Sequence, residues 1–371
     1  MIYSEKNKDA GNTKNCHDNS AVLLLKTKGQ YMNQFLKATF SFYGFDIEVK
    51  CQDKETLESI KRDYSFFIKS QVTPRLFFKV FNETPDYNGL PSLKASVYSP
   101  RNICYRQGNV AYIDYFGKAL TAINYEKNSY TVYSQNFHLR HEIVFLSIMS
   151  LVNQYLDKKH LHRVHGLGLE VFNNALLLLL PSGGGKTTLL LEAIKNESIG
   201  LISEDSPLID REGKAHPFPL RIGVTHDNKP QNIPDEQLHF IERMEAGAKY
   251  VIDIQYFKDK IVSRPVPVRY IFCGVRSLGT ESQILPLSKS ATMKEMIKNS
   301  VVGLGLYQGV EFVLQNGLIE LVKKSGIALS RFINAVRAVT QSRTLLFIIG
   351  SDRGKNVETF LKFCRENINK K

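Results

Sequence analysis

The run A-L-L-L-L-L-P-S-G-G-G-K-T-T-L-L-L-E-A-I, residues 175–194, constrains the fold more than any other part of the chain. Its apolar first part is typical of a buried strand, and the apolar residues after Thr188 predict a helix. The three glycines between them allow backbone turns that other residues resist. A buried strand, a glycine-rich turn and a helix start together form a phosphate-binding loop. The run therefore predicts an α/β domain that binds a nucleoside triphosphate.

The loop fills the last three positions of the pattern G-x-x-x-x-G-K-[ST], while Leu180 stands at the position of the first glycine. Lys186 would reach the β- and γ-phosphates of ATP, and the Thr187 hydroxyl would hold Mg²⁺. The flanking strand and helix argue against the alternative, a strand-to-helix turn with a chance lysine. We expect the nucleotide to contact Ser182, Gly183, Gly184, Gly185, Lys186, Thr187 and Thr188.

An acidic pair, Glu204 and Asp205, follows a second predicted strand at Gly200–Ser203. That strand would deliver both carboxylates to the same sheet edge as the loop. One carboxylate could order Mg²⁺ while the other accepts a hydroxyl proton during phosphoryl transfer. The alternative is a simple turn, because Glu-Asp-Ser-Pro is also good turn chemistry. Upstream, His165 precedes a glycine in R-V-H-G-L-G-L-E, although a lone histidine is more often structural.

Together these residues resemble HPr kinase/phosphorylase and its relatives, which share a kinase core with ATP-dependent phosphoenolpyruvate carboxykinase. The family pattern is a His-Gly pair, a strand, a G-x-S-G-x-G-K-[ST] loop, a helix, a strand and an acidic pair. Order and spacing match here from His165 to Asp205, and Ile209–Arg221 looks like the family's turn and F-P segment. The resemblance implies an α/β P-loop kinase core of this type, with ATP and Mg²⁺ as cofactors. It also implies a smaller α+β domain before the core, where Y-G-F-D-I-E-V stands.

Residue by residue, the resemblance implies that His165 assists Glu204 and Asp205 at the acceptor end, with Asp205 as metal ligand or base. Arg221 is a further candidate for stabilising the transferred phosphate. The chain departs from the pattern at Leu180 and at Glu204, where the family has glycine and aspartate. No clear copy of the E-I-R-G-L-G signature occurs, since Val302–Val310 is only vaguely like it. The resemblance therefore does not extend to phosphorylase activity.

The chain divides into three predicted parts: a disordered segment at 1–19, an α+β domain at 20–155 and a P-loop kinase-like domain at 156–371. In the α+β domain, Phe40–Val49 alternates around a glycine as a hairpin does, and Asp53 could cap a helix that runs to Phe67. Other expected strands are 75–80, 96–98, 110–115, 130–133, 264–274 and 345–350. A helix is expected over 141–157.

The net charge of +13 lies mostly in the last third of the chain. Leu321–Ser351 carries five basic residues and no carboxylate. A positive face there would favour an acidic peptide or protein, or RNA, although a solvated basic surface explains the charge equally well. Five scattered cysteines predict free thiols in a reducing cytoplasm rather than disulfides. No apolar run is long enough to cross a membrane, and we expect no membrane partner.

We expect an ATP-dependent kinase whose acceptor is a hydroxyl, first of all Ser or Thr of a peptide or protein. A small-molecule or RNA kinase could use the same phosphate site. The third alternative is a nucleotide-gated binding module without catalysis. A transporter ATPase fits less well, because no L-S-G-G-Q-like segment follows the loop and the acidic pair comes too soon. The related kinases often form homo-oligomers, which this chain could also do.

Overall fold

The computed structural model describes residues 35–181, 183–225, 229–230, 233–244, 247–302 and 318–368, without the side chains of 302 and 318–324. The expectations for residues 1–19, Ser182 and 303–310 lie outside this part. Contacts place Asn33–Pro85 and Leu93–Lys371 in one compact unit. Asp86–Ser92 belongs to a second unit and contains a turn in which Leu90 N donates to Tyr87 O. The chain is a mixed α/β protein with two large mixed sheets and a three-stranded sheet.

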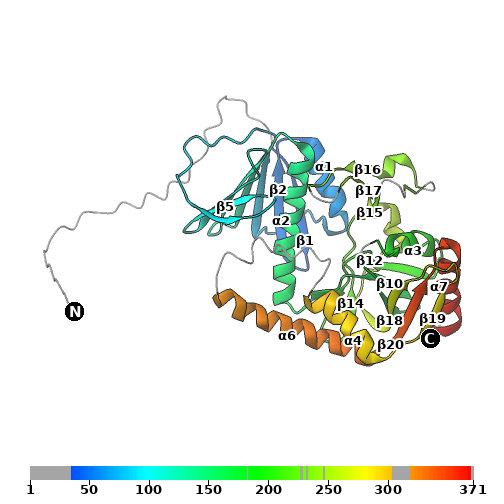
Figure 1. The fold of residues 1–371 in the computed structure, drawn as a ribbon. Helices are drawn as coiled ribbons and strands as arrows, with labels where there is room; N and C mark the ends of the chain where they lie inside the picture. Colours follow the sequence, from blue (N-terminus) through cyan, green and yellow to red (C-terminus); the bar gives the residue numbers. More distant parts are fainter. Residues whose placement is uncertain are drawn as a thin grey trace, which may run out of the picture. The chain divides into compact units, whose positions relative to one another are not determined.

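The first large sheet has the strand order β1-β2-β3-β8-β7-β6-β5-β4 (Figure 1). Its pairs are antiparallel except for β2 with β3 and β3 with β8, which are parallel. The strands are β1 (Leu36–Phe42), β2 (Phe45–Cys51), β3 (Leu76–Phe81), β4 (Ala95–Tyr98), β5 (Ile103–Gln107), β6 (Val110–Asp114), β7 (Leu120–Asn124) and β8 (Ser129–Tyr133).

The predicted hairpin and helix of this region are both confirmed. Strands β1 and β2 pair antiparallel around Tyr43 and Gly44, which both have positive φ angles, 54° and 87°. Helix α1 (Lys54–Asp63) begins after Asp53, whose side chain accepts from Thr56 N. The helix ends earlier than expected, because a 3₁₀ turn over Ser65–Phe67 takes its last residues.

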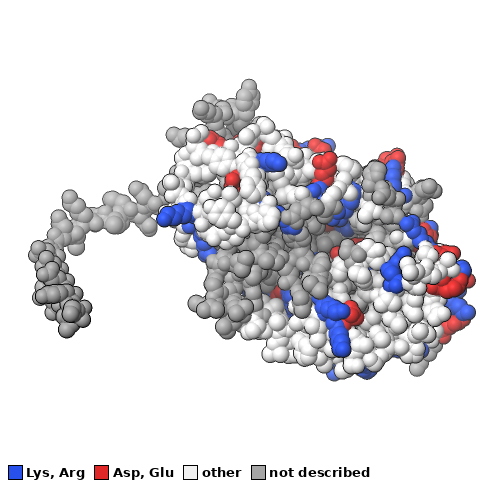
Figure 2. All heavy atoms as spheres, viewed as in Figure 1, with Lys and Arg blue, Asp and Glu red and all other residues white. Residues whose placement is uncertain are grey.

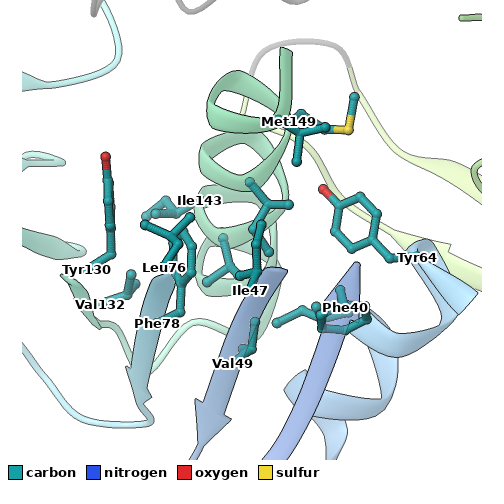
Figure 3. Close-up of a cluster of buried hydrophobic side chains, with 14 of the residues drawn as sticks. Phe40, Ile47, Val49, Tyr64, Leu76, Phe78, Tyr130, Val132, Ile143 and Met149 are labelled. Carbon is teal, nitrogen blue, oxygen red and sulfur yellow. The ribbon is translucent and has the colours of Figure 1, made fainter. Parts of the chain in front are cut away.

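Helix α2 (Phe137–Lys158) extends the expected helix at both ends and packs against the first sheet. Figure 3 shows Ile143 of this helix beside apolar side chains of the sheet, and Met149 belongs to the same buried cluster. Phe40, Ile47 and Val49 are fully buried in this cluster. The aromatic residues of the region therefore fill a core, as general burial tendencies predict.

The second large sheet runs β12-β10-β11-β18-β14-β13-β9, with β20 also paired to β18 and β19 paired to β20. At its centre, β11, β18 and β20 are parallel neighbours. The strands are β9 (His162–Arg163), β10 (Leu167–Val171), β11 (Asn174–Leu179), β12 (Ile199–Ser203), β13 (Leu208–Ile209), β14 (Lys214–His216), β18 (Val266–Arg276), β19 (Gln283–Pro286) and β20 (Arg343–Ile349).

Alternate residues of β11 enter two different cores, as the period of a strand requires. Leu176 and Leu178 pack with α3 (Lys186–Ala193) and α7 (Arg353–Asn367), while Leu177 and Leu179 pack with α4 (Lys289–Met296) and α6 (Leu318–Gln341). Helices therefore cover both faces of β11, which explains its unbroken run of leucines.

The three-stranded sheet has the order β15-β17-β16, formed by β15 (Ile222–Thr225), β16 (Leu238–Ile241) and β17 (Lys249–Ile252). It packs into the same core as α3. The remaining described elements are the 3₁₀ segments Asp235–Gln237 and Ile254–Lys260 and the π-helical turn Ile297–Val302. Among the described helices, none has the length and apolar character that a bilayer crossing requires. Four cysteines, Cys51, Cys104, Cys273 and Cys364, are buried free thiols.

Candidate functional site

The turn between β11 and α3, residues 181–185, is here called the glycine loop. Gly183 and Gly185 have φ angles of 74° and 102°, a region that residues with a side chain rarely adopt. Gly185 is the N-cap of α3, and Gly184 N donates to Pro181 O at 3.0 Å. The loop therefore ends at a helix N-terminus, whose free amides and dipole favour an anion.

Leu180, which replaces the first glycine of the loop pattern, points into the core. Its side chain is buried and lies against Gly274 of β18, where an added Cβ would come within 2.3 Å of Leu180 Cδ2. Its carbonyl oxygen accepts from Lys186 Nζ at 2.8 Å. The leucine side chain is thus accommodated by a glycine on the neighbouring strand.

Lys186, the first residue of α3, is buried, with 6% of its surface exposed. Besides the Leu180 carbonyl, its ammonium contacts Pro181 O at 3.4 Å and His165 Nε2 at 3.2 Å. Burial lowers its pKa, and the Asp205 and Glu204 carboxylates oppose that shift. Its close acceptors are all neutral, and the nearest carboxylate oxygen, Asp205 Oδ1, lies 3.9 Å away. The lysine is held where a negatively charged oxygen would bind better.

Thr187 and Glu204 form the first polar contact across the site. Thr187 Oγ1 donates to Glu204 Oε1 at 2.5 Å. Burial and the neighbouring Asp205 carboxylate raise the pKa of Glu204 to about 7. The threonine hydroxyl and this carboxylate are therefore oxygen ligands placed together beside the glycine loop.

Asp205 and His165 form the second contact, next to Lys186. The side chain of Asp205 is 46% exposed, and its Oδ1 lies 3.2 Å from His165 Nδ1 and 3.9 Å from Lys186 Nζ. Gly166 N donates to Asp205 O at 3.4 Å, which ties the two segments together. Burial lowers the pKa of His165. Because the Lys186 ammonium can only donate, Nε2 of the neutral ring must accept, so Nδ1 carries the ring proton. Nδ1 is buried and makes no hydrogen bond to Asp205 or to any other described residue.

These side chains line one cavity of about 1070 Å³. The cavity reaches from the glycine loop to α2 and to the three-stranded sheet. Basic residues outnumber acidic ones among the described residues that line it, as a site for a highly charged anion requires. The basic ones are Arg101, Arg163, Lys186, Lys195, Arg221, Lys229, Arg243, Lys249 and Arg353, and the acidic ones are Glu142, Glu192, Glu204 and Asp205.

Arg221, a candidate from the sequence, also lines the cavity, but its guanidinium is bound to the N-terminal half of the chain. Its Nη1 donates to both carboxylate oxygens of Asp63 at 2.9 Å. Its guanidinium carbon lies 4.0 Å from the centre of the Phe145 ring. His141 Nε2 lies 2.7 Å from the same Asp63 carboxylate. The arginine is thus fixed at the wall of the cavity by a buried carboxylate.

Several cavity residues were not found from the sequence, and Arg163 and Lys249 are two of them. Arg163 lies two residues before His165 in an extended segment, so the alternation of strand residues could have placed both on one side. Lys249 comes from β17, and its side chain packs over Gly223. A Cβ added at Gly223 would lie only 2.5 Å from Lys249 Nζ. Burial and the nearby Arg221 and Arg243 lower its pKa to about 8. No local pattern predicts Lys249, because antiparallel pairing with β15 brings it to the cavity.

The sequence candidates within the described residues therefore converge. Gly183, Gly185, Lys186, Thr187, Thr188, Glu204, Asp205, His165 and Arg221 all line the cavity, and Gly184 lies within the loop. Among the described residues, no group of three or more His, Cys, Asp or Glu side chains could hold a metal ion alone. Thr187 with Glu204 still fits Mg²⁺, which beside a nucleotide takes few protein ligands plus phosphate and water. No protein-family model matches this chain, and no curated protein matches it either.

Proposed function

We propose that this chain is an ATP-dependent kinase with a core of the HPr kinase/phosphoenolpyruvate carboxykinase type, which transfers the γ-phosphate to a hydroxyl. One observation carries the proposal. The glycine loop with Lys186 has two separate polar pairs beside it, the hydroxyl–carboxylate pair Thr187–Glu204 and the carboxylate–imidazole pair Asp205–His165. Phosphoryl transfer needs this division, with a metal side and a proton-accepting side around the phosphates.

The loop and Lys186 would hold the triphosphate. Amides at the start of α3 would bind phosphate oxygens, and the Lys186 ammonium would exchange its carbonyl and imidazole contacts for a phosphate oxygen. This exchange retains the position of the side chain, so the loop need not rearrange. Lys249, buried across the cavity near Glu204, adds a second cation at this end.

The contact between Thr187 and Glu204 supports a role for this pair in holding the metal. The Thr187 hydroxyl and the Glu204 carboxylate would hold Mg²⁺, which would supply positive charge beside the phosphates. Glu204 lies against Thr187 while Asp205 lies against His165. We therefore assign the metal to Thr187 and Glu204, and not to Thr187 and Asp205 as the sequence alone indicates. The extra methylene of glutamate lets its carboxylate reach the threonine hydroxyl.

Asp205 would act as the general base. Its half-exposed carboxylate can accept the proton of the acceptor hydroxyl, while the Nδ1–H of His165, whose nitrogen lies 3.2 Å away, would stabilise its charge. As the proton passes to Asp205, a bond forms between the acceptor oxygen and the γ-phosphorus. The bond from that phosphorus to the β,γ-bridging oxygen breaks, and ADP leaves with the electron pair.

The acceptor we favour is Ser or Thr of an acidic peptide or protein, since basic side chains line the cavity. RNA has less support. On the face drawn in Figure 2, the described Lys and Arg side chains are interspersed with Asp and Glu. Arg331 in the basic stretch is paired with Asp157 at 2.7 Å. A homo-oligomer in the cytoplasm remains part of the proposal through the family resemblance.

A small-molecule kinase is the second candidate. The cavity of about 1070 Å³ is at the upper end of the size typical of small-molecule sites, ~300–1000 Å³. A cavity of this size could enclose a nucleotide together with a small acceptor. A non-catalytic nucleotide-binding module would not need the Asp205–His165 pair.

The proposal is tested with γ-labelled ATP and Mg²⁺. Purified protein is incubated with a cell extract separated into protein, RNA and small-molecule fractions, with Lys186→Ala as the control. We expect label in one fraction with the wild type and none with the variant, and that fraction identifies the acceptor class. ATP hydrolysis without a labelled acceptor would contradict the kinase assignment.

A further inference from the structure

Arg163 is a buried cation whose hydrogen bonds are incomplete. It lies in β9 with 9% of its surface exposed, and its Nη2 donates to Ser206 Oγ. Its Nε and Nη1 are buried and have no hydrogen-bond partner among the described residues. The Phe218 ring centre lies 6.0 Å from its guanidinium carbon and offers no acceptor oxygen. A guanidinium carries five N–H donors, so most of its donor capacity here is unused.

A buried guanidinium without a bound carboxylate is unfavourable, because no ion pair offsets the free-energy cost of removing its charge from water. No carboxylate of the described residues lies within 4.0 Å of it as an ion pair. Asp205 acts on Arg163 only at longer range, and its own contacts are His165 and Lys186. Even so, burial lowers the pKa of Arg163 only to about 10, so the guanidinium stays charged at neutral pH. The position is therefore one where an anion would be strongly favoured.

Arg163 also lies beside the proposed base. It lines the same cavity as the glycine loop and stands two residues before His165, which contacts Asp205. The nucleotide phosphates already have Lys186 and the start of α3. A hydroxyl that approaches Asp205 would bring the rest of its molecule next to Arg163 and Ser206.

We infer that Arg163 binds an anionic group of the acceptor, so that the substrate of the proposed kinase carries an oxyanion close to its reacting hydroxyl. This inference rests on the proposed function and adds the substrate class to it. The oxyanion is a carboxylate or a phosphate, since a guanidinium pairs with either through two parallel hydrogen bonds. Acidic peptides and small hydroxy acids both have this chemistry.

The test uses simple anions as probes on the full-length protein, saturated with Mg²⁺ and β,γ-imido-ATP so that the phosphate loop is filled. Sodium acetate, sodium phosphate and sodium chloride are added at equal ionic strength, and the unfolding temperature is measured. We expect acetate or phosphate to raise the unfolding temperature above its value in chloride, and we expect the rise to saturate with anion concentration. A ligand that binds only the folded state stabilises that state. A rise with acetate alone identifies a carboxylate, and a rise with phosphate alone identifies a phosphate.

Variants then locate the effect. Arg163→Met should lose the anion-specific rise, Arg163→Lys should keep part of it, and Arg264→Met, at an exposed arginine, should keep all of it. With a labelled acceptor identified, Arg163→Met should lower kcat/KM for that acceptor ~10-fold or more at unchanged nucleotide affinity.

Each outcome decides. The inference is overturned when the wild type shows no anion-specific rise, or when Arg163→Met shows the same rise as the wild type. A loss of nucleotide affinity in Arg163→Met would instead assign the arginine to the nucleotide, which also contradicts the inference. Failure of the proposed function has a different signature: either the nucleotide analogue does not stabilise the wild type at all, or it does and no acceptor is labelled from γ-labelled ATP.

Discussion

Glu204 and Asp205 are neighbours in the sequence, but each contacts a different partner in the site. Both follow the last residue of β12, Ser203, in a bend, where Glu204 contacts Thr187 and Asp205 contacts His165. The two carboxylates can therefore have separate functions although they lie close together. Their mutual repulsion contributes to the raised pKa of Glu204.

Replacing Asp205 with Asn should separate binding from transfer. The isosteric amide cannot accept a proton, so we expect transfer to fall by roughly 10²–10⁴-fold, the usual contribution of a general base. Nucleotide affinity should change little, since the Thr187–Glu204 pair and the glycine loop remain. Transfer rates and nucleotide titrations on the same preparation check this, and undiminished transfer would remove Asp205 from the role of base.

Mg²⁺-dependent nucleotide affinity should change with pH around the raised pKa of Glu204, about 7. Below that value the free carboxyl is protonated and must lose its proton to bind the metal. The affinity should therefore rise with pH up to about 7, by up to tenfold per unit, and then level off. Calorimetric titrations between pH 5.5 and 8 test this. In Glu204→Gln the same dependence should disappear, whereas an equal slope in that variant would place the titrating group elsewhere.

Among the structural elements, β11 and β18 illustrate how a departure from the loop pattern is accommodated. Leu180 extends β11 into the core, and the parallel neighbour β18 leaves room for it at Gly274. The glycine loop thus depends on packing between two strands far apart in sequence.

Gly274→Ala should destabilise the protein by about 1–3 kcal/mol, the usual effect of overpacking a core. An added Cβ would come within 2.3 Å of Leu180 Cδ2. Combining it with Leu180→Ala should recover part of the loss, because the shorter side chain frees the space. Denaturant unfolding measures both. The control is Gly279→Ala, where the nearest atom would lie 3.7 Å away. Equal effects at both glycines would contradict this explanation.

Local patterns predicted the elements that position the loop. Strands β11 and β12, the β1–β2 hairpin and the Asp53 cap follow from apolar period and turn chemistry. Strands β5 and β7 and helices α4, α6 and α7 were not predicted. In α6 the buried residues Ala335, Ala338 and Val339 are small, while larger apolar side chains such as Leu329 and Ile333 are exposed. An apolar pattern that does not match burial gives a weak helix signal.

Part of the site could also be predicted from local sequence patterns. His165, Lys186 and the acidic pair lie within a short span of sequence, and strand ends bring them to one edge. Lys249 and the Asp63–Arg221 pair reach the cavity through contacts between distant segments, which no local pattern encodes. Residues supplied by long-range packing are therefore the part of the site that sequence reasoning missed.

Across the whole molecule, a buried polar network joins α1 and α2 to the segment before β15. Asp63 accepts from Arg221 and contacts His141, and all three side chains are largely buried. Burial alone would raise the pKa of Asp63, but Arg221 and His141 hold it below its usual value. The stabilisation is thus present above the unfolded pKa, about 3.8, and is lost as the pH falls through the lower folded pKa.

Asp63→Ala should lower the free energy of unfolding by about 3–5 kcal/mol, because it leaves Arg221 buried and unpaired. Glu295→Ala is the matched control, since it breaks an exposed pair with Lys298 and should cost less than about 1 kcal/mol. Denaturant unfolding compares the two variants. A small effect at Asp63 would mean that the network does not hold the two halves together.

The central claim is that the residues around the glycine loop transfer a phosphate rather than only bind a nucleotide. The most direct measurement follows the γ-label of ATP in single-turnover experiments with the wild type, Lys186→Ala and Asp205→Asn. We predict that label moves to an acceptor only with the wild type, while Asp205→Asn retains bound, intact ATP and Lys186→Ala binds poorly. Label that stays on ATP or appears only as inorganic phosphate with the wild type, across all acceptor fractions, would contradict the claim.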